Sequence, residues 1–350
     1  MDKVTTLAVD LAKEVFFAAG EDARGRVCFE REFRSRRAFE SFLEGLSGPL
    51  EVVLEAGSGA HYWARRLGAR GVRARLLPAH RVCEHRTGNK NDRKDAWALL
   101  RARRDESIHP VAVKSADELK LQAVHRVRSG WLQRRTAVAN QLRGLLAEHG
   151  VVIARGDAAL RRRLEALLGS PPEWLDGDFH ALLAELDGEY RALGERVAVV
   201  DARLKRIAAE DAQARQLATL RGVGPIGATA LACKAREAGR FANSRQFAAY
   251  FGLVPRQHST GGKTRLGRMS RQGDGYIRRV LVSGAQAVLQ KLPAEPAEAP
   301  DTRRLQRWRA RHGTKGAAVR LANRNLRIAW VLLTRGGTYE PDPRQRLAGG

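Results

Sequence analysis

The chain has 350 residues, and its 63 Lys and Arg against 38 Asp and Glu give a formal net charge of +25. With 43% hydrophobic residues it is too apolar for a disordered basic tail, and its three scattered cysteines form neither a disulfide framework nor a zinc-ligand spacing. No uncharged run reaches the roughly 18–20 residues that cross a bilayer, and the N-terminus leads directly into a strand. These features predict a cytoplasmic protein of two or three domains with no membrane partner.

The first hundred residues alternate between apolar runs with strand character and amphipathic helical segments. In chain order we predict strands at 5–9, 15–19 and 27–33, a helix at 35–46, a strand at 51–54, a helix at 62–67, a strand at 74–77 and a helix at 92–104. Three antiparallel strands followed by alternating helices and strands is the order of a ribonuclease-H-like fold. An α/β domain is therefore expected at the N-terminus.

Four carboxylates stand at the ends of these predicted elements. Asp10 ends the first strand, Glu55 ends the fourth, and Asp92 and Asp95 share one face of the helix that they open. Strand ends converge on a common sheet edge, where four acids repel one another unless cations bind. Hard oxygen ligands favour Mg²⁺, with Mn²⁺ as the alternative, and two such ions suit chemistry at a phosphodiester.

Each acid also has a simpler interpretation. Asp92 precedes a helix and is a candidate N-cap, and Asp95 in the first turn favours the helix dipole. Glu55 is followed by the glycine turn at Gly57 and is a candidate surface residue. The four positions taken together favour the metal site over these separate explanations.

From 115 to about 207 the pattern is entirely helical. A seam with spacings of three and four runs through Leu183, Leu186, Tyr190, Leu193, Val197, Val200, Leu204 and Ile207. Glycines and prolines at 168–178 interrupt the helical region. Two interpretations remain open, a helical hairpin within one chain and a coiled coil between two chains.

The last third of the chain holds most of the charge excess, because residues 216–350 contain 25 Lys and Arg but 7 Asp and Glu. A polyanionic partner is expected here, and nucleic acid is the first candidate, since neutralised phosphates release counterions. Gly222 and Gly224 resemble the turn of a helix-hairpin-helix element, whose backbone amides can meet a phosphate, or else serve a purely structural turn. Helices are predicted at 276–289 and 302–333, joined by a linker at 293–300.

Several motifs resemble those of a known family. They are Val9-Asp10-Leu-Ala-Lys13, Leu54-Glu55-Ala-Gly57, Asn89-Lys-Asn-Asp92-Arg-Lys-Asp95, Leu220-Arg-Gly-Val-Gly, Arg245-Gln-Phe247 through Pro255-Arg256, and His258-Ser-Thr-Gly-Gly-Lys263. In order and spacing the chain resembles the DEDD-type insertion-sequence transposases, which are relatives of Piv-type DNA invertases and of bridge-RNA-guided recombinases. The resemblance spans about residues 4–335.

The resemblance implies a fold and a mechanism. It implies a RuvC-like domain over 1–110 whose Asp10, Glu55, Asp92 and Asp95 hold Mg²⁺, a helical coiled-coil segment over 111–213, and a basic, mostly helical transposase domain over 214–350. In this family a serine attacks a DNA phosphate and forms a covalent phosphoester. Strict alignment places Thr260 at the serine position and a shift of one places Ser259, which we favour because its primary hydroxyl is less hindered.

The resemblance also implies partners. Around the serine loop stand seven cations that we expect to contact phosphate: Arg256, Lys263, Arg265, Arg268, Arg271, Arg278 and Arg279. Donor and target DNA, a structured noncoding guide RNA, a homodimer or homotetramer, and a location at the nucleoid of a prokaryotic cell are expected with them. Two other functions remain: a RuvC-like nuclease that hydrolyses DNA junctions with water, and a nucleic-acid scaffold without catalysis.

Overall fold

The structure is a computed structural model that describes residues 3–11, 15–46, 49–88, 91–260 and 263–339. It divides into two compact units, Met1–Leu119 and Lys120–Gly350. The strands and helices of the first unit are β1 (Thr6–Leu11), β2 (Phe16–Glu21), β3 (Val27–Phe33), α1 (Arg36–Glu44), β4 (Glu51–Glu55), α2 (Ala60–Gly68), β5 (Arg73–Leu77), α3 (Ala79–Val82), a 3₁₀ turn (Cys83–His85) and α4 (Asp92–Arg103).

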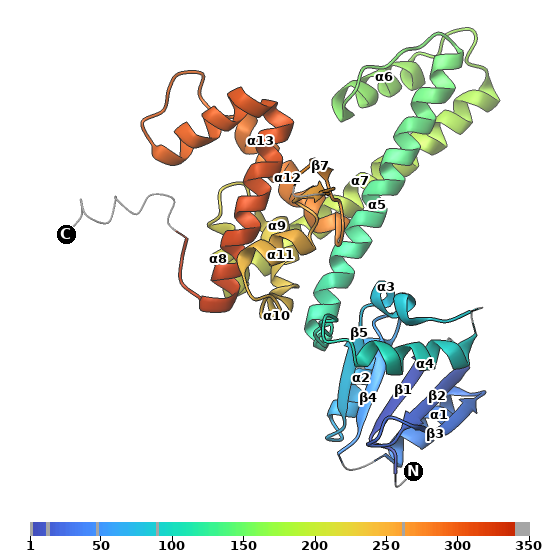
Figure 1. Ribbon diagram of the computed structural model, residues 1–350. Helices are drawn as coiled ribbons and strands as arrows, with labels where there is room; N and C mark the ends of the chain where they lie inside the picture. Colours follow the sequence, from blue (N-terminus) through green and yellow to red (C-terminus); the bar gives the residue numbers. More distant parts are fainter. Residues whose placement is uncertain (1–2, 12–14, 47–48, 89–90, 261–262, 340–350) are drawn as a thin grey trace. The chain divides into compact units, whose positions relative to one another are not determined.

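The first unit is a mixed five-stranded sheet in the order β3-β2-β1-β4-β5 (Figure 1). The pairs β1–β2 and β2–β3 are antiparallel, whereas β4 and β5 run parallel to β1 and to each other. The predicted sequence of antiparallel strands followed by alternating helices and strands is therefore confirmed. It gives β1 and β4 a common carboxyl-terminal edge.

Strand alternation assigns the side chains to the two faces of this sheet. Leu7 and Val9 belong to the core that includes α1 and α2. Ala8 and Val53 belong to a second core with α4, which carries Leu99. Both faces of the sheet are thus covered, as expected for strands that are almost continuously apolar.

The second unit is helical apart from one short hairpin. Its elements are α5 (Ala116–Glu148, which begins in the first unit), α6 (Asp157–Gly169), α7 (Gly177–Glu210), α8 (Ala212–Ala218), α9 (Pro225–Ala232), α10 (Ala235–Ala238), α11 (Ser244–Tyr250), β6 (Pro255–Gln257), β7 (Leu266–Met269), α12 (Gly275–Gln290) and α13 (Pro300–Arg335). The fold class of an α/β region followed by a helical region is confirmed.

The hydrophobic seam of α7 is covered within its own chain. Leu183, Tyr190 and Leu193 are buried in a core shared with α5 and α6, and the two long helices lie side by side (Figure 1). Of the two open interpretations of the seam, the structure has the intramolecular helical hairpin.

The basic C-terminal region folds around α12 and α13, whose buried residues form one core with α8, α9 and α11. Within α13, Gly313 has φ 66° and ψ 170°, so the element consists of two helical limbs that meet at a kink. The sequence pattern predicted one helix at 302–333 without this break. No helix among the described residues has the length and apolar character of a membrane span.

Candidate functional site

The carboxyl-terminal edge of β1 and β4 places two of the predicted acids in neighbouring positions. The parallel register pairs Val9 with Leu54, so Asp10 and Glu55 are the next residues on adjacent strands. By strand alternation Asp10 follows Ala8, and Glu55 follows Val53, onto the face covered by α4. Both side chains are half-buried.

The start of α4 carries the other two acids. Asn91 is the N-cap, with its Oδ1 accepting from the Lys94 backbone N–H at 2.8 Å. The interpretation of Asp92 as the cap is therefore wrong, because Asp92 is the first helical residue, and it is exposed. One turn later Asp95 is 6% exposed, and α4 lies against β1, β2 and β4.

Asp95 is charge-compensated but incompletely bonded. Its carboxylate forms an ion pair with the Arg86 guanidinium. Even so, the buried Oδ1 atom of Asp95 and Nε of Arg86 lack a hydrogen bond of acceptable geometry among the described residues. These are the same two atoms that form the ion pair, so the positive charge beside this buried carboxylate is that of Arg86.

The four acids do not converge into one set of ligands. Among the described residues, no three His, Cys, Asp or Glu side chains are placed to hold one metal ion. Asp10, Glu55 and Asp95 share one side and one edge of the sheet, and Asp92 lies at the exposed helix start. Within the described part of the chain, neither Glu55 nor Asp92 forms an ion pair, although arginines are abundant in this unit. Hard oxygen donors of this kind are the ligands of Mg²⁺ and Mn²⁺.

The predicted nucleophile lies on the connection between β6 and β7. Ser259 and Thr260 are both exposed. The Gln257 side chain donates to Ser259 Oγ at 2.9 Å, which leaves the hydroxyl proton free to be given up. Thr260 instead forms a bridge with Lys263, whose N–H donates to the Thr260 carbonyl at 3.1 Å. Gly261 and Gly262 of the same motif lie outside the described residues.

The seven predicted cations do not form a single patch. Arg268 and Arg271 line a groove beside α13, whereas Arg279 lines a separate cavity. Arg278 Nη1 donates to the carbonyls of Phe251 and Gln272 at 2.9 and 2.7 Å, so this side chain fixes the fold of its loop. The remaining three, Arg256, Lys263 and Arg265, are exposed on the hairpin.

The glycine turn at Gly222 has a demonstrable structural role. Gly222 has φ +88°, and a Cβ added at Gly284 of α12 would stand 2.0 Å from the Gly222 carbonyl oxygen. Gly224 is the N-cap of α9, followed by Pro225 at the first helical position. The turn also borders the second cavity, of about 670 Å³, which Arg279 lines.

A buried histidine joins α5 to the start of α12. His125 is 4% exposed and its Nδ1 lies 2.9 Å from the Tyr276 hydroxyl. Burial lowers the pKa of His125 to about 4; Arg128 acts in the same direction and Asp274 opposes it. The ring is therefore neutral at pH 7.

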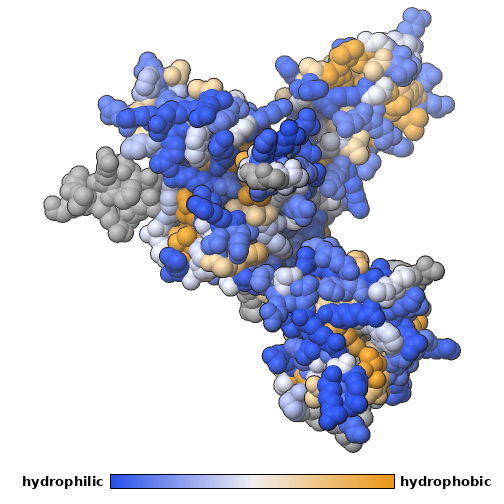
Figure 2. Space-filling model, in the orientation of Figure 1, coloured by the Kyte–Doolittle hydropathy of each residue, from blue (hydrophilic) through white to orange (hydrophobic). Residues whose placement is uncertain are grey.

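The sequence interpretation missed the residues of α13 that form the other wall of the larger groove. This groove of about 1300 Å³ is lined from α13 by Arg304, Trp308, Arg320, Asn323, Arg324 and Arg327. Hydrophilic side chains cover most of the visible surface over α13 (Figure 2). The available signal was helical spacing, because positions 320, 323 and 327 lie on one face of a helix.

Two sequence models of transposase families match the chain. The model of the IS116/IS110/IS902 transposase family matches residues 214–299, and the DEDD transposase model of the IS110 group matches residues 7–150. The first match covers the serine hairpin and the second covers all four acids.

Curated proteins match over almost the whole chain. A probable family 20 transposase of Pseudomonas aeruginosa is 40% identical over 97% of this chain and 99% of its own length. The transposase of insertion sequence element IS1328 from Yersinia enterocolitica is 34% identical, covering 97% and 99%. That of IS1111A from Coxiella burnetii is 33% identical, covering 97% and 92%. The chain therefore belongs to the DEDD-type IS110 family of insertion-sequence transposases, enzymes that act on DNA.

Proposed function

We propose that this transposase cuts and rejoins DNA through a covalent phosphoester between DNA and Ser259, in a reaction that depends on a divalent cation. The observation that carries the proposal is the separation of two chemistries in one chain. Asp10 and Glu55 end adjacent strands at the carboxyl edge of the mixed sheet, as a RuvC-like domain would require, and an exposed, hydrogen-bonded serine lies on a basic hairpin.

In the serine step one phosphoester bond forms as another breaks. Ser259 Oγ attacks the phosphorus, an Oγ–P bond forms, the P–O bond to one DNA oxygen breaks, and the serine proton passes to that leaving oxygen. Attack by a DNA hydroxyl in the reverse sense restores the DNA linkage and the serine. Gln257 assists by donating to Oγ, which fixes the orientation of the hydroxyl.

The four acids are proposed to bind the divalent cation. Asp10, Glu55, Asp92 and Asp95 would hold Mg²⁺, or Mn²⁺ in its place, and when bound the cation supplies charge stabilisation at the phosphate. Arg86 forms an ion pair with the buried Asp95 carboxylate and orients it. Because Glu55 and Asp92 form no ion pair with any described residue, both are available as oxygen ligands.

We further propose that a structured RNA guides the reaction and that two or four copies of the chain act together. Base pairing would then select the DNA sequence, while the arginines of the second unit hold backbone. Two duplexes that are cut and rejoined require several active sites, which favours a dimer or tetramer. Sequencing the RNA that copurifies with the chain tests the guide RNA. The mass of the protein in solution tests the dimer or tetramer.

Adduct trapping tests the central proposal. The full chain is incubated with Mg²⁺ and a plasmid that carries the insertion sequence with its flanks, then denatured. We expect DNA-linked protein, and mass spectrometry should locate the nucleotide on Ser259. Ser259→Ala should abolish the adduct and Thr260→Ala should retain it. The reverse result would move the nucleophile to Thr260, and free DNA ends without any adduct would indicate hydrolysis instead.

A further inference from the structure

We propose that the groove between the β6–β7 hairpin and α13 binds an unpaired segment of DNA strand next to the site of cutting. Its bases would stack on Trp308 and on the apolar floor, and its phosphates would pair with the surrounding arginines. The inference rests on the proposed function only in taking DNA as the substrate, and it requires neither the serine nor the cation.

The groove combines an apolar floor with cationic walls. The floor includes Leu253, Met269 and Ile328, and none of the eighteen lining residues is acidic. On the hairpin side, Leu266 is 64% exposed beside Arg265 and Arg268, so its apolar side chain is accessible to a ligand. The groove therefore offers apolar surface and positive charge to the same ligand.

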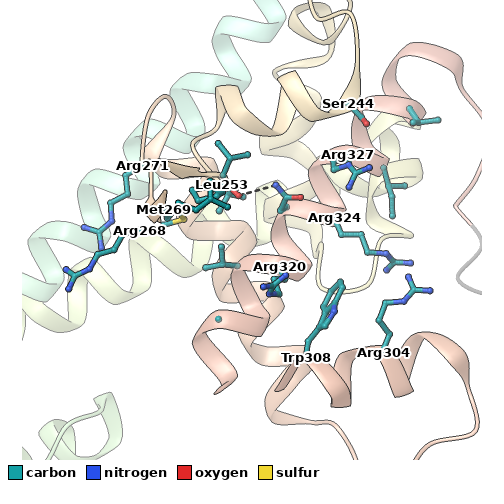
Figure 3. A pocket seen from close by; sticks show the side chains of 18 residues that line it. Ser244, Leu253, Arg268, Met269, Arg271, Arg304, Trp308, Arg320, Arg324 and Arg327 are labelled. Atoms are coloured by element: carbon teal, nitrogen blue, oxygen red, sulfur yellow. Dashed lines mark hydrogen bonds between the residues drawn. The ribbon is translucent and has the colours of Figure 1, made fainter. Parts of the chain in front are cut away.

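The arginines of the groove are available to a ligand. Within the described residues, Arg268, Arg271, Arg304, Arg320 and Arg327 have no carboxylate partner, whereas Arg324 pairs with buried Asp301 at 3.0 Å. Trp308 and Arg304 point from the first limb of α13 toward the second limb, which carries Arg320, Arg324 and Arg327 (Figure 3). Cations thus stand on both sides of the indole.

Backbone geometry holds one of these cations in place. Arg271 has φ 57°, in the left-handed region that non-glycine residues rarely adopt. Its N–H donates to the Gly252 carbonyl at 3.2 Å, and a Cβ at Gly252 or Gly273 would clash with backbone at 2.4 or 1.9 Å. Two glycines are therefore needed to present Arg271 in this conformation, and strain of this kind accompanies functional positions.

The chemistry of the groove favours an unpaired strand over a duplex. A duplex keeps its base faces stacked inside and would leave the apolar floor uncovered, while a single strand can place its bases on aromatic and apolar side chains. At about 1300 Å³ the groove exceeds the roughly 300–1,000 Å³ of small-ligand sites, so several nucleotides fit.

Two features favour DNA over RNA as the occupant. Among the lining side chains, Ser244 and Asn323 are those that could accept the proton of a 2′-hydroxyl, because the arginines and Trp308 only donate. The Asn323 amide already donates to the Leu253 carbonyl at 3.1 Å (Figure 3). Pro255 of β6 and Leu266, Arg268 and Met269 of β7 line the groove, so the hairpin that carries Ser259 also forms one of its walls.

Binding measurements on the full chain test the proposal. Fluorescence anisotropy gives the Kd of oligo(dU) and oligo(rU) of about twelve nucleotides, and of a duplex of equal length. We expect Trp308→Ala to weaken oligo(dU) binding roughly tenfold and to leave duplex binding unchanged, with Trp308→Phe restoring most of the affinity. Equal losses for single strand and duplex, or no loss, would overturn the proposal. A tighter Kd for oligo(rU) would overturn the assignment to DNA.

A second pair of variants excludes damage to the core, since Trp308 is partly buried against it. Arg320→Gln with Arg327→Gln removes two groove cations, and Arg307→Gln with Arg311→Gln removes two exposed cations of the first limb that do not line the groove. The first pair should weaken oligo(dU) binding more than the second. Equal effects would assign the binding to overall charge and reject the groove.

Photocrosslinking locates the strand directly. Oligo(dU) that carries 5-iodouracil should crosslink to Trp308 or to another groove residue, as mapped by mass spectrometry, and crosslinks confined to other surfaces would reject the groove. Failure of the proposed function gives a different result, namely normal oligo(dU) binding with no serine adduct.

Discussion

The two units of the molecule use the same side chain, arginine, in opposite ways. In the first unit 22 Lys and Arg face 18 Asp and Glu, and the arginines are largely paired. Arg103, for example, contacts buried Glu21 at 3.1 Å and Glu51 at 2.5 Å. In the second unit the groove arginines other than Arg324 have no carboxylate partner among the described residues. A net charge therefore indicates a polyanionic partner only where cations remain after internal pairing.

The acids show the complementary pattern. Glu21 and Glu51 form ion pairs with Arg103 within the first unit. Glu55 and Asp92 form no ion pair with the described residues. We therefore expect the functional residues among the carboxylates of the first unit and the arginines of the second unit that form no ion pair with the described residues. The first set suits a cation and the second suits phosphate.

Of the variants that test this comparison, Asp95→Asn should have the largest effect, and the effect should be on strand cutting. It keeps the shape of the buried side chain but removes the charge, so strand cutting should fall about a thousandfold or more, as the loss of several kcal/mol of transition-state stabilisation requires. Nucleic-acid binding by the second unit should persist. Cutting assays and anisotropy on one preparation measure both, with exposed Glu106→Gln as the matched control. Undiminished cutting would exclude Asp95 from the site.

Protonation of His125 should destabilise the second unit alone. Because the pKa of His125 is lowered to about 4 from 6.5, the unfolded chain binds the extra proton between these values. Stability is then complete above about pH 6.5 and falls toward pH 4, by up to about 1.4 kcal/mol per pH unit and on the order of 3 kcal/mol in all.

Urea unfolding across this pH range measures the effect. His125→Gln should flatten the dependence, whereas exposed His80→Gln in the first unit should leave it as in the natural chain. An unchanged slope in His125→Gln would show that other groups cause the acid sensitivity.

Gly284→Ala should also act on the second unit only, with a smaller effect. Its new Cβ meets the Gly222 carbonyl at 2.0 Å, and overpacking of this kind costs about 2 kcal/mol. Gly188→Ala in α7 is the control, because nothing lies within 4 Å of its Cβ and alanine favours a helix. Thermal unfolding should therefore shift in opposite directions for the two variants, and parallel shifts would contradict the close contact.

The smallest expected effect is on the salt dependence of DNA binding. It is tested by comparing Arg279, which forms no ion pair with the described residues, with Arg93, which does. Arg279→Gln should reduce the slope of log K against log salt for duplex DNA by about 0.9, the value of one lost phosphate contact. Arg93→Gln should leave that slope unchanged, because Arg93 is paired with Glu30 at 2.9 Å. A similar reduction of the slope in both variants would mean that an arginine in an internal ion pair still contacts DNA phosphate.

Local patterns predicted the elements of the first unit well. Its strands β1, β2 and β4 are mainly apolar runs, and the order of the predicted elements limits the sheet to a few topologies. The neighbouring positions of Asp10 and Glu55 follow from that order. The ion pair of Asp95 with Arg86 does not, because no local pattern specifies which arginine contacts a buried carboxylate.

In the second unit the long-range contacts escaped prediction. The β6–β7 hairpin is short and polar, so no apolar alternation marked it. His125 meets Tyr276 across 151 positions of sequence, and the groove needs residues from 244 to 331. The assignment of the three domains and of the seven phosphate contacts stays a prediction.

The kink at Gly313 makes the width of the groove depend on one residue. Its φ of 66° with ψ of 170° lies in a region that is essentially restricted to glycine, although a Cβ there would meet no atom within 4 Å. Any other residue has room for its side chain but not for this backbone, so it would tend to straighten the two limbs into one rod. The distance between Trp308 on the first limb and Arg320 and Arg327 on the second limb therefore depends on the glycine at position 313.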